Sequence, residues 1–137
     1  MTNGNENPIV RVSEVMKTEF DIIDGMDTIE TALKKMNHVQ NKCLIVNKRH
    51  ANDEYGVLLI SDIARKVLAA NKAPDRVNVY EVMAKPVISV HSNMDVRYCA
   101  RLFDRFNISR APVVDDGKVI GIVSFTDMVL KGLNIPV

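Results

Sequence analysis

Four polar side chains in the second half of the chain have the types and spacing to hold an oxygen-rich ligand. Ser124, Thr126 and Asp127 lie where a predicted strand passes into a predicted helix. Unpaired amides and the positive end of a helix dipole at such a junction attract phosphate, and the two hydroxyls can donate to it. A carboxylate there repels phosphate but accepts two hydrogen bonds from the vicinal hydroxyls of a ribose. Arg110, just before another predicted strand, adds a forked donor suited to phosphate.

A purely structural role is the alternative for the same residues. Ser-Asp and Thr-Asp before a helix are ordinary caps, so Asp62 and Asp127 can serve only to start their helices. Arg110 can equally be a solvated surface arginine. The combination of an arginine, two hydroxyls and a carboxylate favours the ligand role for Asp127.

The elements that position these residues occur twice in the chain. Val-Ser-Glu-Val-Met at 12–16 returns as Val-Tyr-Glu-Val-Met at 79–83, a shift of 67 positions. After a loop that is two residues longer in the first copy, the shift becomes 65, and 56–62 matches 121–127. Two copies at so long a period indicate an internally duplicated domain and not a solenoid.

Each copy is predicted to fold as β-α-β-β-α, which makes the chain an α+β protein of two pseudo-twofold-related repeats in one compact module. Hydrophobic spacing and turn residues give the boundaries. The first copy is expected to contain a helical or turn segment at 12–16, a strand at 21–23, a Thr28-capped helix through Val39, strands at 43–46 and 56–60, and a helix opened by Ser61 and Asp62. The second is expected to contain a strand at 87–90, an Asp95-capped helix, a strand at 111–114, a hairpin turn at 115–118, a strand at 119–125 and a helix opened by Thr126 and Asp127. The expected boundaries are a flexible tail at 1–8, repeat 1 at 9–72 and repeat 2 at 73–137.

Composition narrows the function classes. The 137 residues are 47% hydrophobic and 26% charged, which is ordinary for one globular domain. The net charge of +1 argues against nucleic acid or an anionic membrane as partner, and no apolar run is long enough to span a bilayer. Cys43 and Cys99, which lie in no paired motif, are expected to be buried and reduced in a cytoplasmic protein.

Catalytic and metal-binding patterns are missing from the sequence. His38, His50 and His91 are scattered without metal-ligand spacing, and there is no glycine-rich phosphate loop with a lysine. We therefore expect a protein that is not an enzyme and that requires no metal or cofactor.

The repeated pattern resembles the cystathionine β-synthase (CBS) domain family, specifically a tandem pair or Bateman module. The resemblance covers about 12–133, and it rests on Val-Met before the first strand, Ala-Pro-Val-Val at 111–114, Gly-Ile-Val-Ser-Phe-Thr-Asp at 121–127 and its degenerate copy at 56–62. It implies a regulatory adenine nucleotide (AMP, ADP, ATP or NAD-like) bound between the repeats, and association as flat dimers. The resemblance implies that Asp127 binds ribose, because it stands at the position of the ribose-binding aspartate of the family motif. Arg110 matches a phosphate-binding arginine of pairs such as the AMP-activated kinase γ subunit.

The resemblance also implies two unequal sites. The stronger one would combine the four polar residues with adenine contacts from Met83, Pro86, Val87 and Ala111. The weaker one retains Ser61 and Asp62, but Leu59 stands in the place of Ser124 and Cys43 in the place of Arg110. The other residues expected at the weaker site are Met16, Lys17, Lys42 and Leu44.

The function expected from the sequence is a sensor that converts nucleotide binding into a change of dimer geometry. Its output would pass to a protein effector in trans. Tyr98 and Leu102, one turn apart on a second face of their helix, are interpreted as an oligomer surface. The alternatives are a structural dimerisation adaptor with vestigial clefts and, less favoured, a small nucleotide-handling enzyme.

Overall fold

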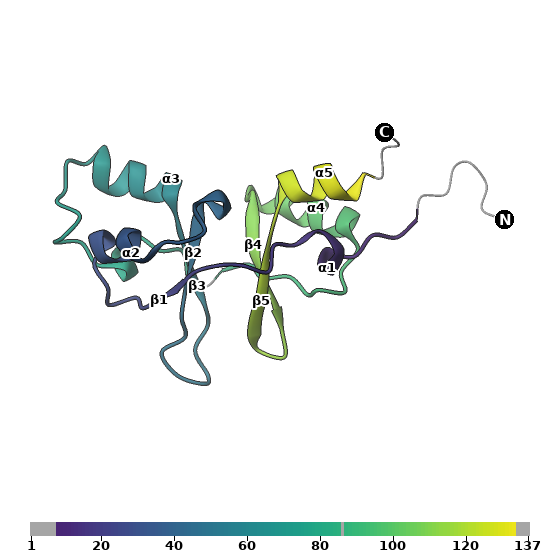
Figure 1. Cartoon of the computed structure of the whole chain (residues 1–137), viewed down its shortest axis with the longest axis horizontal. Coiled ribbons are helices and arrows are strands. Elements are labelled where there is room, and N and C mark those ends of the chain that lie inside the picture. The colour runs from purple at the N-terminus through teal and green to yellow at the C-terminus, as the bar shows by residue number, and fades with distance from the viewer. Residues whose placement is uncertain (1–7, 86, 134–137) are drawn as a thin grey trace. The chain divides into compact units, whose positions relative to one another are not determined.

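The computed structural model describes residues 8–85 and 87–133, which form two compact units (Figure 1). The first unit is Glu19–Ile88, and the second combines Met1–Thr18 with Ser89–Val137. Each sequence copy begins with a leading segment, around Met16 in the first copy and around Met83 in the second. This segment packs in the unit that holds the rest of the other copy. The repeats at 9–72 and 73–137 are the duplicated stretches of sequence, whereas the packed units are bounded near residues 18 and 88.

The first unit is built on a three-stranded sheet. Its β2 (Cys43–Val46) pairs in parallel with β1 (Ile22–Ile23) and antiparallel with β3 (Gly56–Leu59). The free edge of β3 is extended by Ala84, which exchanges two backbone hydrogen bonds of 2.9 and 3.0 Å with Val57. The helical elements of this unit are α2 (Ile29–Lys35), α3 (Ile60–Ile63), the π-helical turn η2 (Ala64–Leu68) and the 3-10 turns η1 (Val39–Asn41) and η3 (Val79–Glu81).

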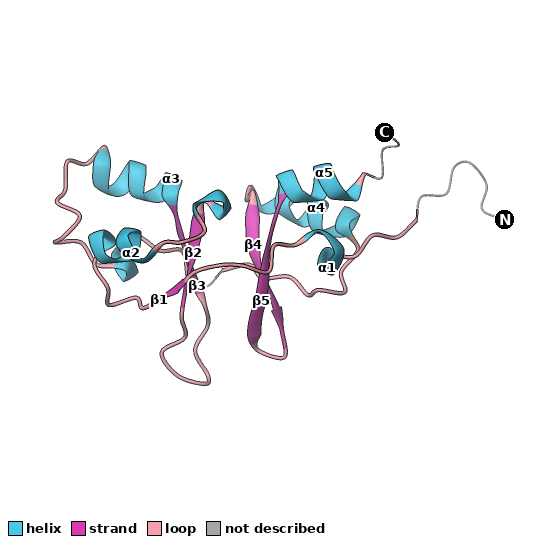
Figure 2. Cartoon of the chain, in the orientation of Figure 1, coloured by secondary structure: helices cyan, strands magenta, loops and turns pink. Residues whose placement is uncertain are grey.

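The second unit repeats this plan around a hairpin. Strands β4 (Arg110–Asp115) and β5 (Lys118–Ser124) are joined by a two-residue turn, in which Asp116 and Gly117 have φ of 51° and 75° (Figure 2). Positive φ at both central positions is what a type I′ turn needs, and it matches the twist of the strands. Val90 bridges to Val113 on one edge, and Lys17 bridges to Ile122 on the other. The helices are α1 (Val12–Val15), α4 (Val96–Phe106) and α5 (Phe125–Gly132).

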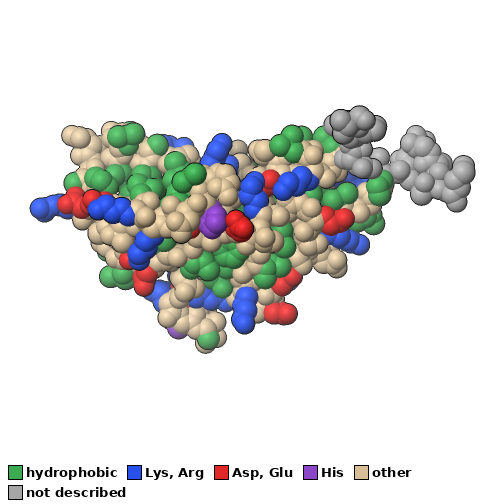
Figure 3. All heavy atoms as spheres, in the orientation of Figure 1, with side chains coloured by type: hydrophobic (Ala, Val, Ile, Leu, Met, Phe, Trp, Pro, Cys, Tyr) green, Lys and Arg blue, Asp and Glu red, His purple; other side chains and the backbone are tan. Residues whose placement is uncertain are grey.

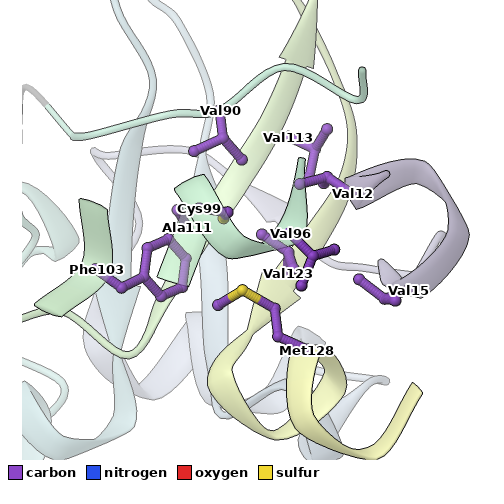
Figure 4. Packing of buried hydrophobic residues seen from close by; sticks show 10 residues of the cluster. All are labelled: Val12, Val15, Val90, Val96, Cys99, Phe103, Ala111, Val113, Val123 and Met128. Atoms are coloured by element: carbon purple, nitrogen blue, oxygen red, sulfur yellow. The ribbon is translucent and has the colours of Figure 1, made fainter. Parts of the chain in front are cut away.

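The core of the second unit lies between its helices and the hairpin (Figure 4). Val96, Cys99 and Phe103 form the buried face of α4, and the Phe103 ring meets that of Phe125 edge to face at 5.3 Å. Burying such side chains supplies most of the stabilisation of a unit this small. The remaining buried members are Val12, Val15, Val90, Ala111, Val113, Val123 and Met128. Two of them, Val12 and Val15, come from the N-terminal segment.

Several predicted boundaries differ from the structure, and hydrogen bonding explains the difference in the first long helix. The Thr28-capped helix ends at Lys35 and not near Val39, because the Asp21 carboxylate accepts from the amides of Asn37 (3.0 Å) and His38 (2.9 Å) and draws the chain out of the helix. The strand predicted at 87–90 is reduced to the single bridge at Val90. The helices predicted to open at Ser61 and Thr126 begin one residue earlier, at Ile60 and Phe125.

Candidate functional site at the start of α5

Ser124 and Asp127 form a reciprocal cap at the start of α5. The Ser124 hydroxyl accepts from the Asp127 amide at 3.2 Å and donates to Asp127 Oδ2 at 3.0 Å. Both residues are buried, with 9% and 4% of their surface exposed, whereas Thr126 between them is exposed. The cap therefore fixes the orientation of the Asp127 carboxylate.

Lys17 brings a cation to this carboxylate from the N-terminal segment. Its backbone exchanges hydrogen bonds of 2.8 and 2.9 Å with Ile122 of β5, and its Nζ lies 2.8 Å from Asp127 Oδ1. Gly121 makes the approach possible, since a Cβ atom there would lie 2.7 Å from the Lys17 carbonyl oxygen. A second cation, Lys131, lies 3.9 Å from the same Oδ1. Both oxygens of the carboxylate thus have partners.

The strand register carries Arg110 to the same end of the hairpin. Arg110 is directly opposite Ser124, and Ala111 is opposite Val123. The predicted residues Arg110, Ala111, Ser124, Thr126 and Asp127 are therefore brought together in one unit. With Lys17 and Lys131 added, positive charges outnumber the single carboxylate, which suits an anionic group better than the sequence alone suggests.

Two of the donors expected to bind phosphate are instead engaged within the protein. The Ser124 hydroxyl is committed to Asp127, and the Phe125 amide donates to the Ser109 carbonyl at 3.0 Å. Ser124 is thus a positioning residue. The side chains of Thr126, Lys17 and Arg110 have donors chemically suited to phosphate, and that of Lys17 is paired with Asp127.

The equivalent junction in the first unit has different chemistry. Leu59 is opposite Cys43 in the sheet, at the positions of Ser124 and Arg110, and the Asp62 carboxylate is paired with Arg65 at 2.5 Å. Ala84 occupies the place of Lys17. Of the other residues expected here, Ser61 and Lys42 are exposed, Lys42 accepts from the Ile60 amide at 3.1 Å through its carbonyl, and Leu44 is buried in the core.

The leading segment of each sequence copy packs with the strands of the other copy. Met16 and Lys17, expected beside Asp62, pack in the second unit against Gly121 and Ile122. Met83, expected with Asp127, packs in the first unit against Gly56, and Val87 belongs to that unit too. The reason is that each leading segment adds to the edge of the third strand of the other copy. Pro86 lies outside the described residues.

Each unit also has an open hollow away from its strand–helix junction. In the second unit a hollow of about 920 Å³ lies at the turn end of the hairpin, beside Asp115, whose pKa is lowered by hydrogen bonds from the Ser92 hydroxyl and amide. In the first unit a hollow of about 410 Å³ is lined by Met83 and Lys85 among others. Neither hollow includes the Asp62 or Asp127 junction, where the convergent polar groups lie.

Within residues 8–85 and 87–133, no three His, Cys, Asp or Glu side chains are grouped so as to hold a metal ion. Over the same residues, no helix has the length and apolar character needed to cross a membrane. Cys43 and Cys99 are both buried cysteines outside any disulfide, and burial raises the pKa of Cys99 to about 11.

Comparison with known proteins places this geometry in a family. A family model for the CBS domain matches residues 12–69 and 79–133. An uncharacterized protein of Methanopyrus kandleri is 36% identical over 123 residues, which cover 87% of this chain but only 61% of that protein. The chain thus spans about three fifths of this curated relative.

Solved structures give the same result. A hexameric CBS-CP12 protein from bloom-forming cyanobacteria is 36% identical with a TM-score of 0.87, covering 93% of this chain and 75% of that one. The CBS domain pair of protein MJ0100, in complex with 5′-methylthioadenosine and S-adenosyl-L-methionine, is 29% identical with a TM-score of 0.74, covering 90% and 95%. Two matched repeats, each ending in a strand–helix junction with its aspartate, identify the chain as a member of the CBS domain family, in the form of a tandem pair.

Proposed function

We propose that this CBS pair is a regulatory module that binds an adenine nucleotide at the start of α5. The observation that carries the proposal is the convergence on Asp127 of Lys17, Ser124 and, opposite in the hairpin, Arg110. The carboxylate accepts from the ribose hydroxyls, and Arg110 and Thr126 donate to phosphate. The adenosine-type ligands of the MJ0100 pair support an adenosine-containing ligand here.

The two strand–helix junctions are proposed to be unequal. The second unit supplies Arg110, Thr126, Asp127 and a lysine, and Met16 offers an apolar contact for the base. Ala111, expected as an adenine contact, is instead 2% exposed and belongs to the core. In the first unit Asp62 is already paired with Arg65, and no cation replaces Arg110 or Lys17 at the equivalent positions Cys43 and Ala84. Nucleotide binding at the second unit is therefore stronger.

Binding regulates only if it favours one state of the protein. A ligand shifts an equilibrium between two packings by its difference in affinity for them. We propose that the packings are two geometries of a homodimer in the cytoplasm and that a protein effector detects the change in trans. The hexameric assembly of the CBS-CP12 relative supports self-association as a property of such chains.

A dimerisation adaptor is the second candidate function. Hydrophobic side chains reach the surface over α5, where Val129 and Leu130 are 50% and 77% exposed (Figure 3). Tyr98 and Phe106 of α4 are also more than half exposed. Leu102, expected on the Tyr98 face, instead packs partly against the core. Such side chains favour contact with another protein surface.

Thermal stability with added ligands distinguishes the two functions. Wild type, Asp127→Ala and Arg110→Ala are each titrated with AMP, ADP, ATP and NAD, and Asp62→Ala is the matched variant at the other junction. The proposal expects wild type and Asp62→Ala to be stabilised according to mass action, and the first two variants to respond weakly. A flat response of wild type to every ligand contradicts the sensor and favours the adaptor. A response that is lost only in Asp62→Ala places the site in the first unit.

A further inference from the structure

The Lys17 ammonium donates to the Asp127 oxygen that would otherwise accept from a ribose hydroxyl. Its Nζ lies 2.8 Å from Asp127 Oδ1, while the Ser124 hydroxyl holds Oδ2. The carboxylate is fixed in the first turn of α5 and is 5% exposed, whereas the Lys17 side chain is 31% exposed. Of the two partners, the long lysine side chain is the one that can move towards solvent.

A ligand that takes Asp127 therefore displaces a charge. Leaving the ammonium without an anionic partner costs free energy, and an anionic group on the ligand removes that cost by taking the ammonium itself. An uncharged ligand offers no such replacement, and a cationic ligand adds repulsion. The outcome depends on the charge that the ligand carries at the 5′ position of its ribose.

We infer that Lys17 selects the ligand of this site by charge: it neutralises Asp127 in the free protein and transfers to the ligand's 5′ anionic group when the ribose binds. The inference rests on the proposed nucleotide site at α5. It gives the ligand class as adenosine derivatives with a 5′ phosphate or comparable anion. The first unit, with Ala84 in the equivalent position, lacks this selection.

The test compares three ligands that share adenosine and differ in 5′ charge. AMP is anionic and adenosine is neutral, whereas S-adenosylmethionine has a sulfonium cation next to C5′ and is net positive, its distal carboxylate being offset by an ammonium. Their affinities are measured by isothermal titration calorimetry on wild type, Lys17→Gln and Lys17→Arg. Glutamine keeps a donor for Asp127 without the charge, and arginine keeps the charge. Lys131→Gln is the matched control, because Lys131 faces the same Oδ1 from 3.9 Å and is 51% exposed.

Wild type is expected to bind AMP more tightly than adenosine, and adenosine more tightly than S-adenosylmethionine. In Lys17→Gln the preference for AMP over adenosine should fall by about 10-fold, through weaker AMP binding and unchanged or tighter adenosine binding. Lys17→Arg should retain the preference, and Lys131→Gln should change it by less than about 2-fold.

Equal weakening of AMP and adenosine in Lys17→Gln would show that Lys17 only supports the fold of the site. That result would overturn the inference and leave the nucleotide site standing. Unchanged affinities for all three ligands in Lys17→Gln would overturn it as well. Absence of binding of every ligand to wild type would instead remove the proposed function, and the inference with it.

Discussion

Lys17 and Asp127 form an ion pair at 2.8 Å although 110 positions separate them in the sequence. The pair exists because the segment around Met16 and Lys17 adds to the edge of β5 in the second unit. The chemistry at the start of α5 is therefore assembled from the beginning and the end of the chain. A nucleotide site at the start of α5 therefore depends on the packing of the N-terminal segment against β5.

Gly121 is predicted to be the glycine whose substitution costs the most stability. An added Cβ atom would lie 2.7 Å from the Lys17 carbonyl oxygen, which accepts a backbone hydrogen bond from the Ile122 amide at 2.9 Å. At Gly56 the nearest atom is the flexible Met83 sulfur at 2.9 Å, and at Gly25 the nearest contact is an ordinary 3.4 Å. Gly121→Ala should destabilise the protein by about 1–3 kcal/mol, Gly56→Ala by less and Gly25→Ala hardly at all. Urea unfolding of the three variants measures this order.

One stability result would contradict the close packing of the N-terminal segment on β5. If Gly121→Ala is as stable as Gly25→Ala, then the segment at Met16 and Lys17 does not lie against β5 as closely as the backbone bonds require. The nucleotide response of Gly121→Ala supplies a second reading, since displacement of the segment should weaken AMP binding along with stability.

Ser124 is predicted to contribute more to stability than Thr126, the other hydroxyl residue at the start of α5. Ser124→Ala removes the side-chain cap of α5 and the hydrogen bond to Asp127 Oδ2, which should cost about 1 kcal/mol. Thr126→Ala changes an exposed side chain in the same turn and should change the free energy of unfolding by less than about 0.5 kcal/mol. Equal effects of the two variants in chemical denaturation would mean that the cap contributes little.

Much of the site follows from the sequence because the repeat aligns its residues. The match of 56–62 to 121–127 places Leu59 opposite Cys43 in the sheet, just as Ser124 is opposite Arg110. The role of Lys17 could not be predicted in the same way. Its place depends on backbone hydrogen bonds to a strand edge, and such bonds leave no side-chain pattern in the sequence. The glycine at 121, which permits a close approach of another backbone, was the available signal.

The secondary structure likewise contains features that the local sequence determines and features that tertiary contacts determine. The hairpin turn at Asp116 and Gly117 and the Asp95 cap of α4 are confirmed because each is determined by neighbours along the chain. The end of α2 is determined by Asp21, which lies outside the helix and accepts from two amides just beyond it. Periodicity carries no information about such a tertiary hydrogen bond, so the predicted helix is too long.

Acid should weaken the wild-type protein more than a variant that lacks Asp53. Hydrogen bonds from the Arg49 side chain, and then from Lys85, hold the pKa of Asp53 well below its usual value of 3.8. A carboxyl with a depressed folded-state pKa contributes stability above its unfolded pKa and loses it as the pH falls towards the folded value. The stability difference between wild type and Asp53→Asn should therefore shrink as the pH is lowered from about 6 to about 2.

Melting temperatures of the two proteins across this range measure the effect, with Asp75→Asn at an exposed position as control. The control should follow wild type. A stability gap between wild type and Asp53→Asn that stays constant down to the lowest pH would contradict an ionised, hydrogen-bonded Asp53 in the folded protein.

Cys99 is predicted to resist thiol reagents in the folded protein. Its side chain is fully buried, and desolvation raises its pKa to about 11, so very little thiolate forms at about pH 8. Labelling with a disulfide reagent should be slow in buffer and fast in denaturant, with Cys43→Ser used to isolate the signal of Cys99. Fast labelling of folded Cys43→Ser would show that the core around Phe103 opens readily.

Removal of the N-terminal segment is predicted to damage the second unit and not the first. Deletion of residues 1–18 takes Val12 and Val15, which are 0% and 1% exposed, out of the core that contains Phe103 and Met128. The core of the first unit contains no residue before Ile23 among those described. In hydrogen exchange followed by mass spectrometry, amides of α4 and β5 should lose protection while those of β2 and β3 retain it. Deletion of residues 1–8 removes none of the described core residues and serves as the control. Loss of protection in β2 and β3 instead would mean that the N-terminal segment packs with its own sequence copy. That result would contradict the contact between Lys17 and Asp127.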